Sequence, residues 1–281
     1  MTKIRLDQLV HGRGLTASRE QARRLIMAGE VRVDGQVVDK PAANIAEAAV
    51  IEVRARPRFV SRGGDKLEAA LQHFGLEVRG WVCADLGAST GGFTDVLLQR
   101  GAARVYAIDV GHGILDYRLR LDPRVVVMEK TNARYLASLP EPVQLVTLDA
   151  SFISLKLLLP VARGWLDRRP APLPITDYQV PSLIALIKPQ FEAGRQQVGK
   201  GGIVKDTAVH RQVLADVLGW AAANGLPPAA LIRSPIKGAE GNLEFLVWLR
   251  PGTESPLDHT AAIDAVLVDD EPPLPAADDG P

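Results

Sequence analysis

The sequence predicts an α/β fold built on a doubly wound, mainly parallel sheet. Short, fully apolar runs alternate along the chain with helical patterns, which is typical of strands covered by helices on both faces. A glycine loop at residues 85–94 follows an apolar run beginning at Trp81 and precedes a helical pattern that stops at Gly101. A length of 281 residues and a hydrophobic content of 47% allow more than one globular domain.

Residues 1–53 are predicted to form a small separate α+β domain. A first helical pattern is followed by a second that begins at Ser18, where Ser18 and Gln21 have the spacing of a capping box. Residues 31–38 then indicate two strands joined by Asp34-Gly35, a turn that requires positive φ. Two helices that lead into a hairpin make a compact unit.

The second helix of this domain presents a cluster of arginines. Arg19 and Arg23 are four residues apart, Arg24 lies beside them, and Arg5 precedes the first helix. Guanidinium groups bind phosphate oxygens, so these four residues are candidate RNA-binding residues that place the domain without reading base sequence. A solvated helix face is the alternative that charge alone leaves open.

Residues 54–60 alternate basic residues with a proline and are predicted to be a linker to a larger domain over residues 61–251. Further apolar runs predict its strands at residues 105–108, 125–128, 143–148, 183–187, 231–232 and 245–249. Helical segments are expected near residues 131–139, 155–165 and 207–224. This alternation is the basis of the predicted parallel sheet.

Charge divides the chain unevenly. Residues 252–281 hold eight acidic and no basic residues, and they are predicted to be a largely disordered tail with one short helix near residues 261–266. The remaining body has 33 basic against 25 acidic residues, a net charge of +8 that suits a polyanionic partner. Such an excess is also common on ordinary solvated surfaces.

The sequence predicts a cytoplasmic protein without a metal site or membrane segment. Its single cysteine, Cys83, lies inside a predicted strand, which excludes a disulfide framework and a cysteine metal site within one chain. The amino terminus leads into no apolar signal region, and no apolar run reaches membrane-spanning length.

Charged residues close four of the predicted strands. Asp85, Asp109, Asp149 and Lys188 each follow or end an apolar run. Ligands of open α/β sheets gather at the carboxyl ends of the strands. Each such residue can also be an ordinary soluble strand terminus, but four of them on one edge favour a site.

The glycine loop predicts a nucleotide-type cofactor, because glycines let the backbone approach a ligand and the new helix directs free N–H groups toward it. Ala88 stands where a dinucleotide motif needs its second glycine, and Asp109 lies 24 positions beyond Asp85, near the distance of a ribose-binding carboxylate. S-adenosylmethionine, which has no pyrophosphate, is therefore the predicted cofactor. A tight turn without a ligand is the alternative. The candidate cofactor-binding residues are Asp85, Gly87, Ser89, Gly91, Gly92, Asp109 and Asn132.

The residues near the predicted site argue against two classes of methyl acceptor, a pyrimidine carbon and an exocyclic amine. Cys83 lies on the wrong part of its strand for attack on a pyrimidine carbon, and Asp149-Ala150-Ser151-Phe152 lacks the prolines of an amine-methylating turn. A ribose hydroxyl needs a base, and a lysine can serve when burial and a neighbouring cation lower its pKa. Two lysines with two carboxylates make such an arrangement possible.

Two resemblances carry these inferences further. Residues 3–53 resemble the alpha-L RNA-binding domain of a ribosomal small-subunit protein, through Arg5-Leu6-Asp7, Ser18 to Ala22 and Ile26 to Gly35. The match implies binding to structured RNA through the basic helix. Residues 3 to about 250 resemble the TlyA (haemolysin A) family, through motifs at residues 61–67, 85–95, 148–154, 187–192 and 241–246.

The second resemblance implies a Rossmann-like class I methyltransferase sheet of the FtsJ type and 2'-O-methylation of ribosomal RNA, on cytidines in the best-known members. By the same resemblance Lys66, Asp149, Lys188 and Glu244 match a catalytic tetrad in which Lys188 is the base. Ribosomal RNA or a ribosomal subunit is the implied partner. Residues 167–182 and the acidic tail depart from the family pattern.

Two other functions stay open at this level. One is a non-enzymatic RNA-binding or ribosome-assembly factor that keeps a cofactor fold, against which the four matched charges argue. The other is a membrane-lysing toxin, against which the lack of a long apolar or amphipathic stretch argues.

Overall fold

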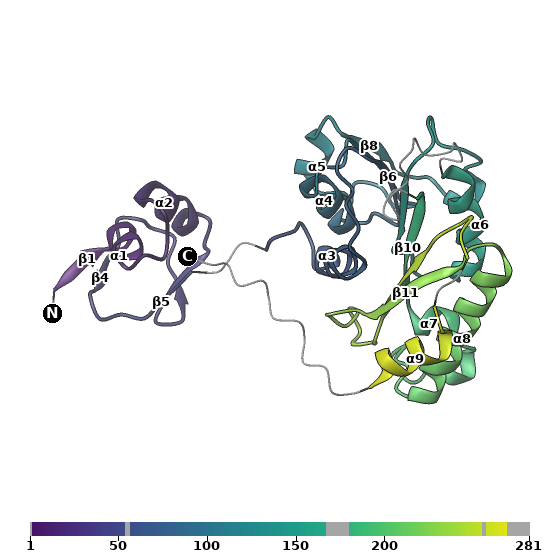
Figure 1. Cartoon of the computed structure of the whole chain (residues 1–281). Coiled ribbons are helices and arrows are strands. Elements are labelled where there is room, and N and C mark those ends of the chain that lie inside the picture. The colour runs from purple at the N-terminus through teal and green to yellow at the C-terminus, as the bar shows by residue number, and fades with distance from the viewer. Residues whose placement is uncertain (1, 54–56, 167–179, 255–256, 269–281) are drawn as a thin grey trace. The chain divides into compact units, whose positions relative to one another are not determined.

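The computed structural model describes residues 2–53, 57–166, 180–254 and 257–268, and the chain divides into two compact units, Met1–Arg58 and Phe59–Pro281. Part of the predicted linker, the proline-rich segment 167–179 and the end of the acidic tail lie outside the described residues. Each unit is described by itself (Figure 1).

The smaller unit packs two helices against short strands. Its central strand β2 (Val31–Val33) pairs antiparallel with β3 (Gln36–Val37) on one side and β5 (Ile51–Val53) on the other. A second pairing, which the sequence did not predict, joins β1 (Lys3–Arg5) to β4 (Asn44–Ala46). Helices α1 (Leu6–Gly12) and α2 (Arg19–Met27) enclose a core of Leu6, Val10, Ala22, Leu25, Ile26, Val31, Val33 and Ala49.

Local sequence signals explain how these elements begin and turn. Ser18 caps α2 by accepting the N–H of Gln21, as the predicted capping box requires, while the Gln21 side chain accepts the N–H of Ala17 rather than that of Ser18. Asp34 and Gly35 both have positive φ, 49° and 78°, which confirms the predicted tight turn between β2 and β3.

The larger unit is built on a seven-stranded sheet with the order β11-β12-β10-β9-β6-β7-β8. The five neighbouring strands from β10 to the edge strand β8 are parallel, and β12 runs antiparallel to both β10 and β11. The strands are β6 (Val82–Leu86), β7 (Arg104–Ile108), β8 (Val125–Met128), β9 (Leu145–Leu148), β10 (Ser182–Ile187), β11 (Pro228–Arg233) and β12 (Phe245–Leu249). The predicted doubly wound, mainly parallel α/β sheet is confirmed.

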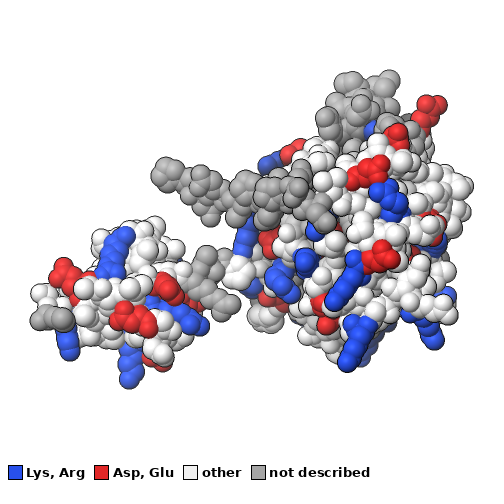
Figure 2. Space-filling model, turned by 90° about the horizontal axis from the view of Figure 1, so that it is seen from below, with Lys and Arg blue, Asp and Glu red and all other residues white. Residues whose placement is uncertain are grey.

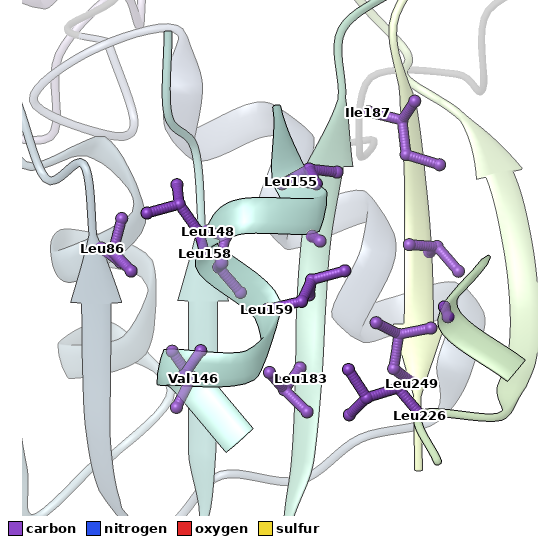
Figure 3. Close-up of a cluster of buried hydrophobic side chains, with 14 of the residues drawn as sticks. Leu86, Val146, Leu148, Leu155, Leu158, Leu159, Leu183, Ile187, Leu226 and Leu249 are labelled. Atoms are coloured by element: carbon purple, nitrogen blue, oxygen red, sulfur yellow. The ribbon is translucent and has the colours of Figure 1, made fainter. Parts of the chain in front are cut away.

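Helices cover both faces of this sheet (Figure 1). One face carries α3 (Gly63–Phe74), α4 (Gly92–Gln99) and α5 (Tyr117–Leu121). The other carries α6 (Leu155–Trp165) and α8 (Thr207–Ala223), and Figure 3 shows Leu155, Leu158 and Leu159 of α6 against Leu148 and Leu183 of the strands. Shorter helical segments are η1 (Ala133–Tyr135), α7 (Pro189–Glu192) and η3 (Arg195–Gln197).

The structure corrects two local predictions and confirms a third. The expected helix near residues 131–139 is only the short η1, because Asn132 caps it and Leu136 already leaves the helical region with ψ 95°. Strand β6 runs through Asp85 to Leu86 instead of stopping at Ala84. The short helix predicted near residues 261–266 of the tail is confirmed and spans residues 259–267.

Helix α9 (His259–Leu267), the helix predicted in the tail, belongs to the larger unit. Asp258 caps it by accepting the N–H of Ala261, and Ile263 is buried in the core that α8 also lines. The acidic composition of the tail indicated a chain exposed to solvent, but the apolar side of this helix packs against α8 and β11. Among the described residues no helix is long and apolar enough to cross a membrane.

Candidate active site

Two adjoining cavities open at the carboxyl ends of the parallel strands, where the strand order reverses between β9 and β6. The larger cavity, of about 410 Å³, extends past the end of β7, and the smaller cavity, of about 290 Å³, extends toward the start of α3. Gly87, Ser89, Asp149 and Ser151 line both cavities. A ligand in one is therefore in reach of a ligand in the other.

The glycine loop forms the floor shared by the two cavities. Gly87 has φ +84°, and a Cβ at this position would lie 2.5 Å from the backbone oxygen of Asp149. Only glycine therefore lets the loop pass the end of β9 so closely. Ser89 also has positive φ, and its N–H donates to Asp109 Oδ2 at 2.8 Å. These constraints hold the loop in one shape.

The larger cavity combines two carboxylates, Asp109 and Asp149, with apolar walls. Asp109, at the end of β7, accepts backbone N–H groups from Ser89 and from Gly111, at 2.8 and 2.7 Å, and it stays partly exposed. Asn132 lines the same cavity, and Val110, Ile153 and other apolar residues complete it. A ligand with hydroxyl groups and a flat apolar ring fits such a lining.

Two of the predicted cofactor residues do not reach either cavity. Asp85 is fully buried beneath the loop, where it accepts hydrogen bonds from Thr94 Oγ1 and Thr147 Oγ1, at 2.7 and 3.1 Å. Burial raises the pKa of this carboxyl to about 7. Gly91 faces the core, since a Cβ there would meet Leu119 at 2.2 Å. Both residues support the loop from within, while Gly92 lines the smaller cavity.

Four charged residues far apart in sequence form two lysine–carboxylate pairs beside the smaller cavity. Lys66, in the first turns of α3, lies 2.5 Å from Glu244 Oε2, and Lys188, after β10, lies 2.6 Å from Asp149 Oδ1. The antiparallel direction of β12 brings its beginning, and with it Glu244, to the edge where the parallel strands end. The fold therefore places all four matched residues at one edge of the sheet.

The two pairs differ in their surroundings. The two lysines are almost equally buried, at 10% exposed for Lys66 and 11% for Lys188, and both line the smaller cavity. Their carboxylates differ, because Glu244 is 3% exposed whereas Asp149 is 21% exposed and lines both cavities. Lys188 also donates a hydrogen bond to Ser151 Oγ at 2.9 Å. An amine held beside a cavity in this way can take a proton from a hydroxyl group.

The structure adds residues that the sequence did not single out. Ser61, Arg62, Ser151 and Lys237 line the smaller cavity, and Arg62 and Lys237 are exposed there. Ser61, Arg62 and Ser151 lie inside the motifs that carry the family resemblance, but those motifs alone assigned no role to them. Phe152, with φ +64°, exposes 91% of its surface and has its ring 5.0 Å from that of Phe191.

Another residue of a recognised motif has a supporting place. Asn242 is buried and holds the loop before α8, because its Oδ1 accepts the N–H of Val204 and its Nδ2 donates to the carbonyl of Gly202, both at 2.9 Å. The motif at residues 241–246 thus contains two buried polar residues with different roles. Asn242 anchors a loop, and Glu244 pairs with Lys66.

The four candidate RNA-binding arginines of the smaller unit fall into two groups. Arg5 and Arg19 form ion pairs with the fully buried Asp7, each at 3.0 Å. Arg23 and Arg24 are exposed on α2, and within the described residues neither forms an ion pair. Figure 2 shows one face of each unit, where Lys and Arg are interspersed with Asp and Glu. Charge on that face alone therefore does not outline a nucleic-acid surface.

Comparisons with known proteins cover both units. The model of the FtsJ-like methyltransferase family matches residues 59–251, and the S4 domain model matches residues 4–51. The 16S/23S rRNA (cytidine-2'-O)-methyltransferase TlyA of Mycobacterium tuberculosis is 43% identical over 94% of the chain and 96% of that protein. Hemolysin A of Brachyspira hyodysenteriae is 41% identical over 86% of the chain and 98% of that protein.

A solved structure is also similar over nearly the whole chain. A candidate hemolysin from Streptococcus thermophilus has a TM-score of 0.69 and 41% identity, with 95% of each chain covered.

Proposed function

The chain belongs to the FtsJ-like methyltransferase family and carries an S4 domain, and from this membership we propose that it methylates the 2'-oxygen of a cytidine ribose in ribosomal RNA. The observation that carries the proposal is the pair of lysine–carboxylate contacts beside a cavity suited to a nucleoside. The named activity of the Mycobacterium tuberculosis relative, which the chain covers almost completely, supports the choice of acceptor.

As a methyltransferase of this family, the protein uses S-adenosylmethionine. The larger cavity suits it, because Asp109 offers a carboxylate to the ribose hydroxyls and Asn132 with Val110 offers an amide and an apolar wall to the adenine. The glycine loop leaves the methionine part room between Gly87 and Ser89. When bound, the cofactor supplies a methyl carbon that accepts the electron pair of the ribose oxygen while the carbon–sulfur pair stays on sulfur.

We propose that Lys188 is the base. Its neutral amine takes the proton of the 2'-hydroxyl and leaves the step as an ammonium ion, which Asp149 stabilises from 2.6 Å. Lys66 keeps its charge against Glu244 and adds a fixed positive field near the developing oxygen anion. Arg62 and Lys237 on the cavity wall are placed to attract the phosphates of the RNA backbone.

The S4 domain gives the enzyme a second way to hold RNA. Arg23 and Arg24 are exposed and without an ion pair among the described residues, so their guanidinium groups are available to phosphates. We propose ribosomal RNA or a ribosomal subunit as the partner, and the cytoplasm as the place of action.

The test is methyl transfer from tritium-labelled S-adenosylmethionine to separate small and large ribosomal subunits that lack the modification. Reverse-transcription stops at low nucleotide concentration then locate a 2'-O-methyl group. We expect a stop at a cytidine in at least one subunit, which depends on the protein. If the RNA is labelled but shows no such stop, the methyl group is on a base instead of a ribose, and the proposed acceptor is refuted.

A further inference from the structure

Lys188 has two oxygen neighbours, and the second of them has no assigned role. Its Nζ lies 2.6 Å from Asp149 Oδ1 and 2.9 Å from Ser151 Oγ, to which it donates. We propose that Ser151 is a positioning residue that, together with Asp149, directs the free electron pair of the Lys188 amine toward the hydroxyl to be deprotonated. This inference rests on the proposed role of Lys188 as the base.

The geometry of an amine makes the second oxygen matter. A neutral lysine amine has two N–H groups and one electron pair around a tetrahedral nitrogen. Ser151 Oγ accepts one N–H and the ion-pair contact with Asp149 Oδ1 lies beside the other, so the electron pair is left with the one remaining direction. With Asp149 alone, one N–H is engaged and the electron pair divides its time between two directions.

The remaining direction faces the substrate side of the site. Asp149 and Ser151 both follow β9, whereas Lys188 reaches them from the neighbouring β10, and all three line the smaller cavity. The two acceptors therefore engage the amine from the β9 side. The electron pair points away from that side, into the smaller cavity, where the proposed ribose hydroxyl binds.

The loop that carries Ser151 is fixed at both of its ends. At the start, the N–H of Asp149 donates to the carbonyl of Leu86, and the loop at Gly87 packs against the Asp149 carbonyl. At the end, Ser154 Oγ and the N–H of Leu155 both donate to the Glu192 carboxylate, each at 2.7 Å. A loop held in this way keeps the Ser151 hydroxyl in one place.

The second anchor ties Ser151 to the base itself. Glu192 lies in α7, the short helix that begins immediately after Lys188. The Glu192 carboxylate therefore joins the loop after β9 to the segment after β10. The distance between Ser151 Oγ and Lys188 Nζ thus follows from the backbone of both loops as well as from the two side chains.

The other lysine of the site lacks this arrangement. Among the described residues Lys66 has Glu244 as its single recorded hydrogen-bond partner. One partner suits a lysine that keeps its charge, since all three N–H groups of an ammonium ion are donors and no electron pair has to be aimed. The hydroxyl beside Lys188 distinguishes the base from the fixed cation.

Ser151→Ala and Ser151→Thr test the inference in the full-length protein with ribosomal subunits as substrate. Threonine keeps the hydroxyl and alanine removes it. We expect kcat of S151A to fall on the order of tenfold, the scale of a modest misalignment at a reacting centre, with KM for RNA within about twofold of wild type. S151T should recover most of kcat.

The pH dependence of kcat distinguishes a change in the direction of the Lys188 electron pair from a change in the protonation of the amine. If Ser151 only influenced how much of the amine is neutral, S151A would regain wild-type kcat on the alkaline plateau, and the inference would be overturned. A persistent loss on that plateau supports it. An increase of kcat in S151A would mean that the hydroxyl occupies the electron pair instead of leaving it free, which also overturns the inference.

A measurement without turnover keeps this test separate from the proposed function. Carbon-13 relaxation of the Lys188 ε-carbon reports how restricted the motion of the amine end of the side chain is, as an order parameter. The signal is assigned because it is missing from the spectrum of Lys188→Arg. We expect lower order in S151A than in wild type and restored order in S151T, with the affinity for S-adenosylmethionine by calorimetry unchanged in both. Equal order in all three proteins would refute the positioning role, whereas a wild-type protein that methylates no RNA would refute the proposed function instead.

Discussion

The two lysine–carboxylate pairs of the site are built from the same groups, yet they differ in what surrounds them. Lys66 and Lys188 are almost equally buried, and both line the smaller cavity. Their carboxylates differ, because Glu244 is buried away from both cavities, 2.5 Å from Lys66, whereas Asp149 lines both cavities. A hydroxyl adds a second contact to the Lys188 amine. A lysine held by a buried carboxylate keeps its charge, while one whose oxygen neighbours face a cavity can exchange a proton with a substrate.

The same contrast recurs in the smaller unit. Arg5 and Arg19 are engaged by the buried Asp7, and the Arg5 guanidinium contributes most to holding the pKa of that carboxyl below its usual range. Arg23 and Arg24 are exposed on the same helical region. In both units, a cation paired with a buried carboxylate supports the fold, whereas Lys188, Arg23 and Arg24 have no fully buried carboxylate partner among the described residues and are available to a ligand.

Replacing the lysine at the cavity wall should have the largest effect. Lys188→Ala is expected to lower kcat for RNA methylation by at least about 10³-fold, because it removes the general base. The loss of stability in urea should be smaller than that from breaking the Lys66–Glu244 pair, since Asp149, the partner left behind, is 21% exposed and lines both cavities. Retained S-adenosylmethionine binding by calorimetry is the control, and substantial residual methylation would assign the base elsewhere.

A buried carboxylate without a cation extends the comparison. Burial raises the pKa of Asp85 in the folded state to about 7, above its unfolded value near 3.8. The folded state therefore holds this proton more tightly, so the contribution of Asp85 to stability is fully present below about pH 4 and is lost as the pH rises to about 7, amounting to about 4 kcal/mol.

Asp85→Asn should remove this pH dependence while keeping hydrogen bonds to Thr94 and Thr147 possible. Urea unfolding of both proteins between pH 4 and pH 8 measures it. We expect the stability of D85N relative to wild type to rise over that range. A constant difference would mean that Asp85 is ionised in the folded protein throughout.

Breaking the enclosed pair should cost stability in addition to activity. Glu244→Ala leaves Lys66 without its partner at an almost buried position, and we expect a loss of about 3 kcal/mol in the free energy of unfolding, at the low end for a buried pair because Lys66 borders the smaller cavity. The exposed neighbour Glu240 is the matched control, and Glu240→Ala should change stability by less than about 0.5 kcal/mol. Equal effects of the two substitutions would contradict the importance of the pair.

The smallest effect is expected from the exposed arginines. The double substitution Arg23→Gln with Arg24→Gln should weaken binding to ribosomal subunits about tenfold and reduce the salt dependence of binding, without lowering the melting temperature. Arg19→Gln should instead destabilise the smaller unit, because Asp7 loses one of its two cations. A filter-binding titration with a melting curve for each variant distinguishes the two outcomes, and unchanged affinity of the double variant would refute docking through α2.

Local patterns in the sequence were enough for the fold class, the cofactor and the family. Apolar runs alternating with helical patterns determine a doubly wound sheet because each strand must be covered on both faces. Ala88 in place of a glycine pointed away from pyrophosphate and toward S-adenosylmethionine. The resemblance to the TlyA family, carried by five motifs, implied Lys66, Asp149, Lys188 and Glu244 as a tetrad, although their catalytic roles stay a prediction.

What the sequence could not provide is the direction and partner of each side chain. Asp85 falls in a glycine-rich motif, but strand alternation turns it with Cys83 toward α4 and away from the cavities. The contact between Lys66 and Glu244 joins residues 178 positions apart, and it depends on β12 running against its neighbours. Helix α9 forms because α8 and β11 offer it an apolar surface, which composition does not reveal.

The sequence by itself thus determined that Asp109, Asp149 and Lys188 stand at the strand ends, because strand ends and glycine loops follow from short-range patterns. The tertiary structure alone decided which lysine pairs with a buried carboxylate and which has a cavity-lining carboxylate and Ser151 beside it. Those differences come from long-range packing of loops after β9 and β10 and from the antiparallel β12, and no local pattern encodes them.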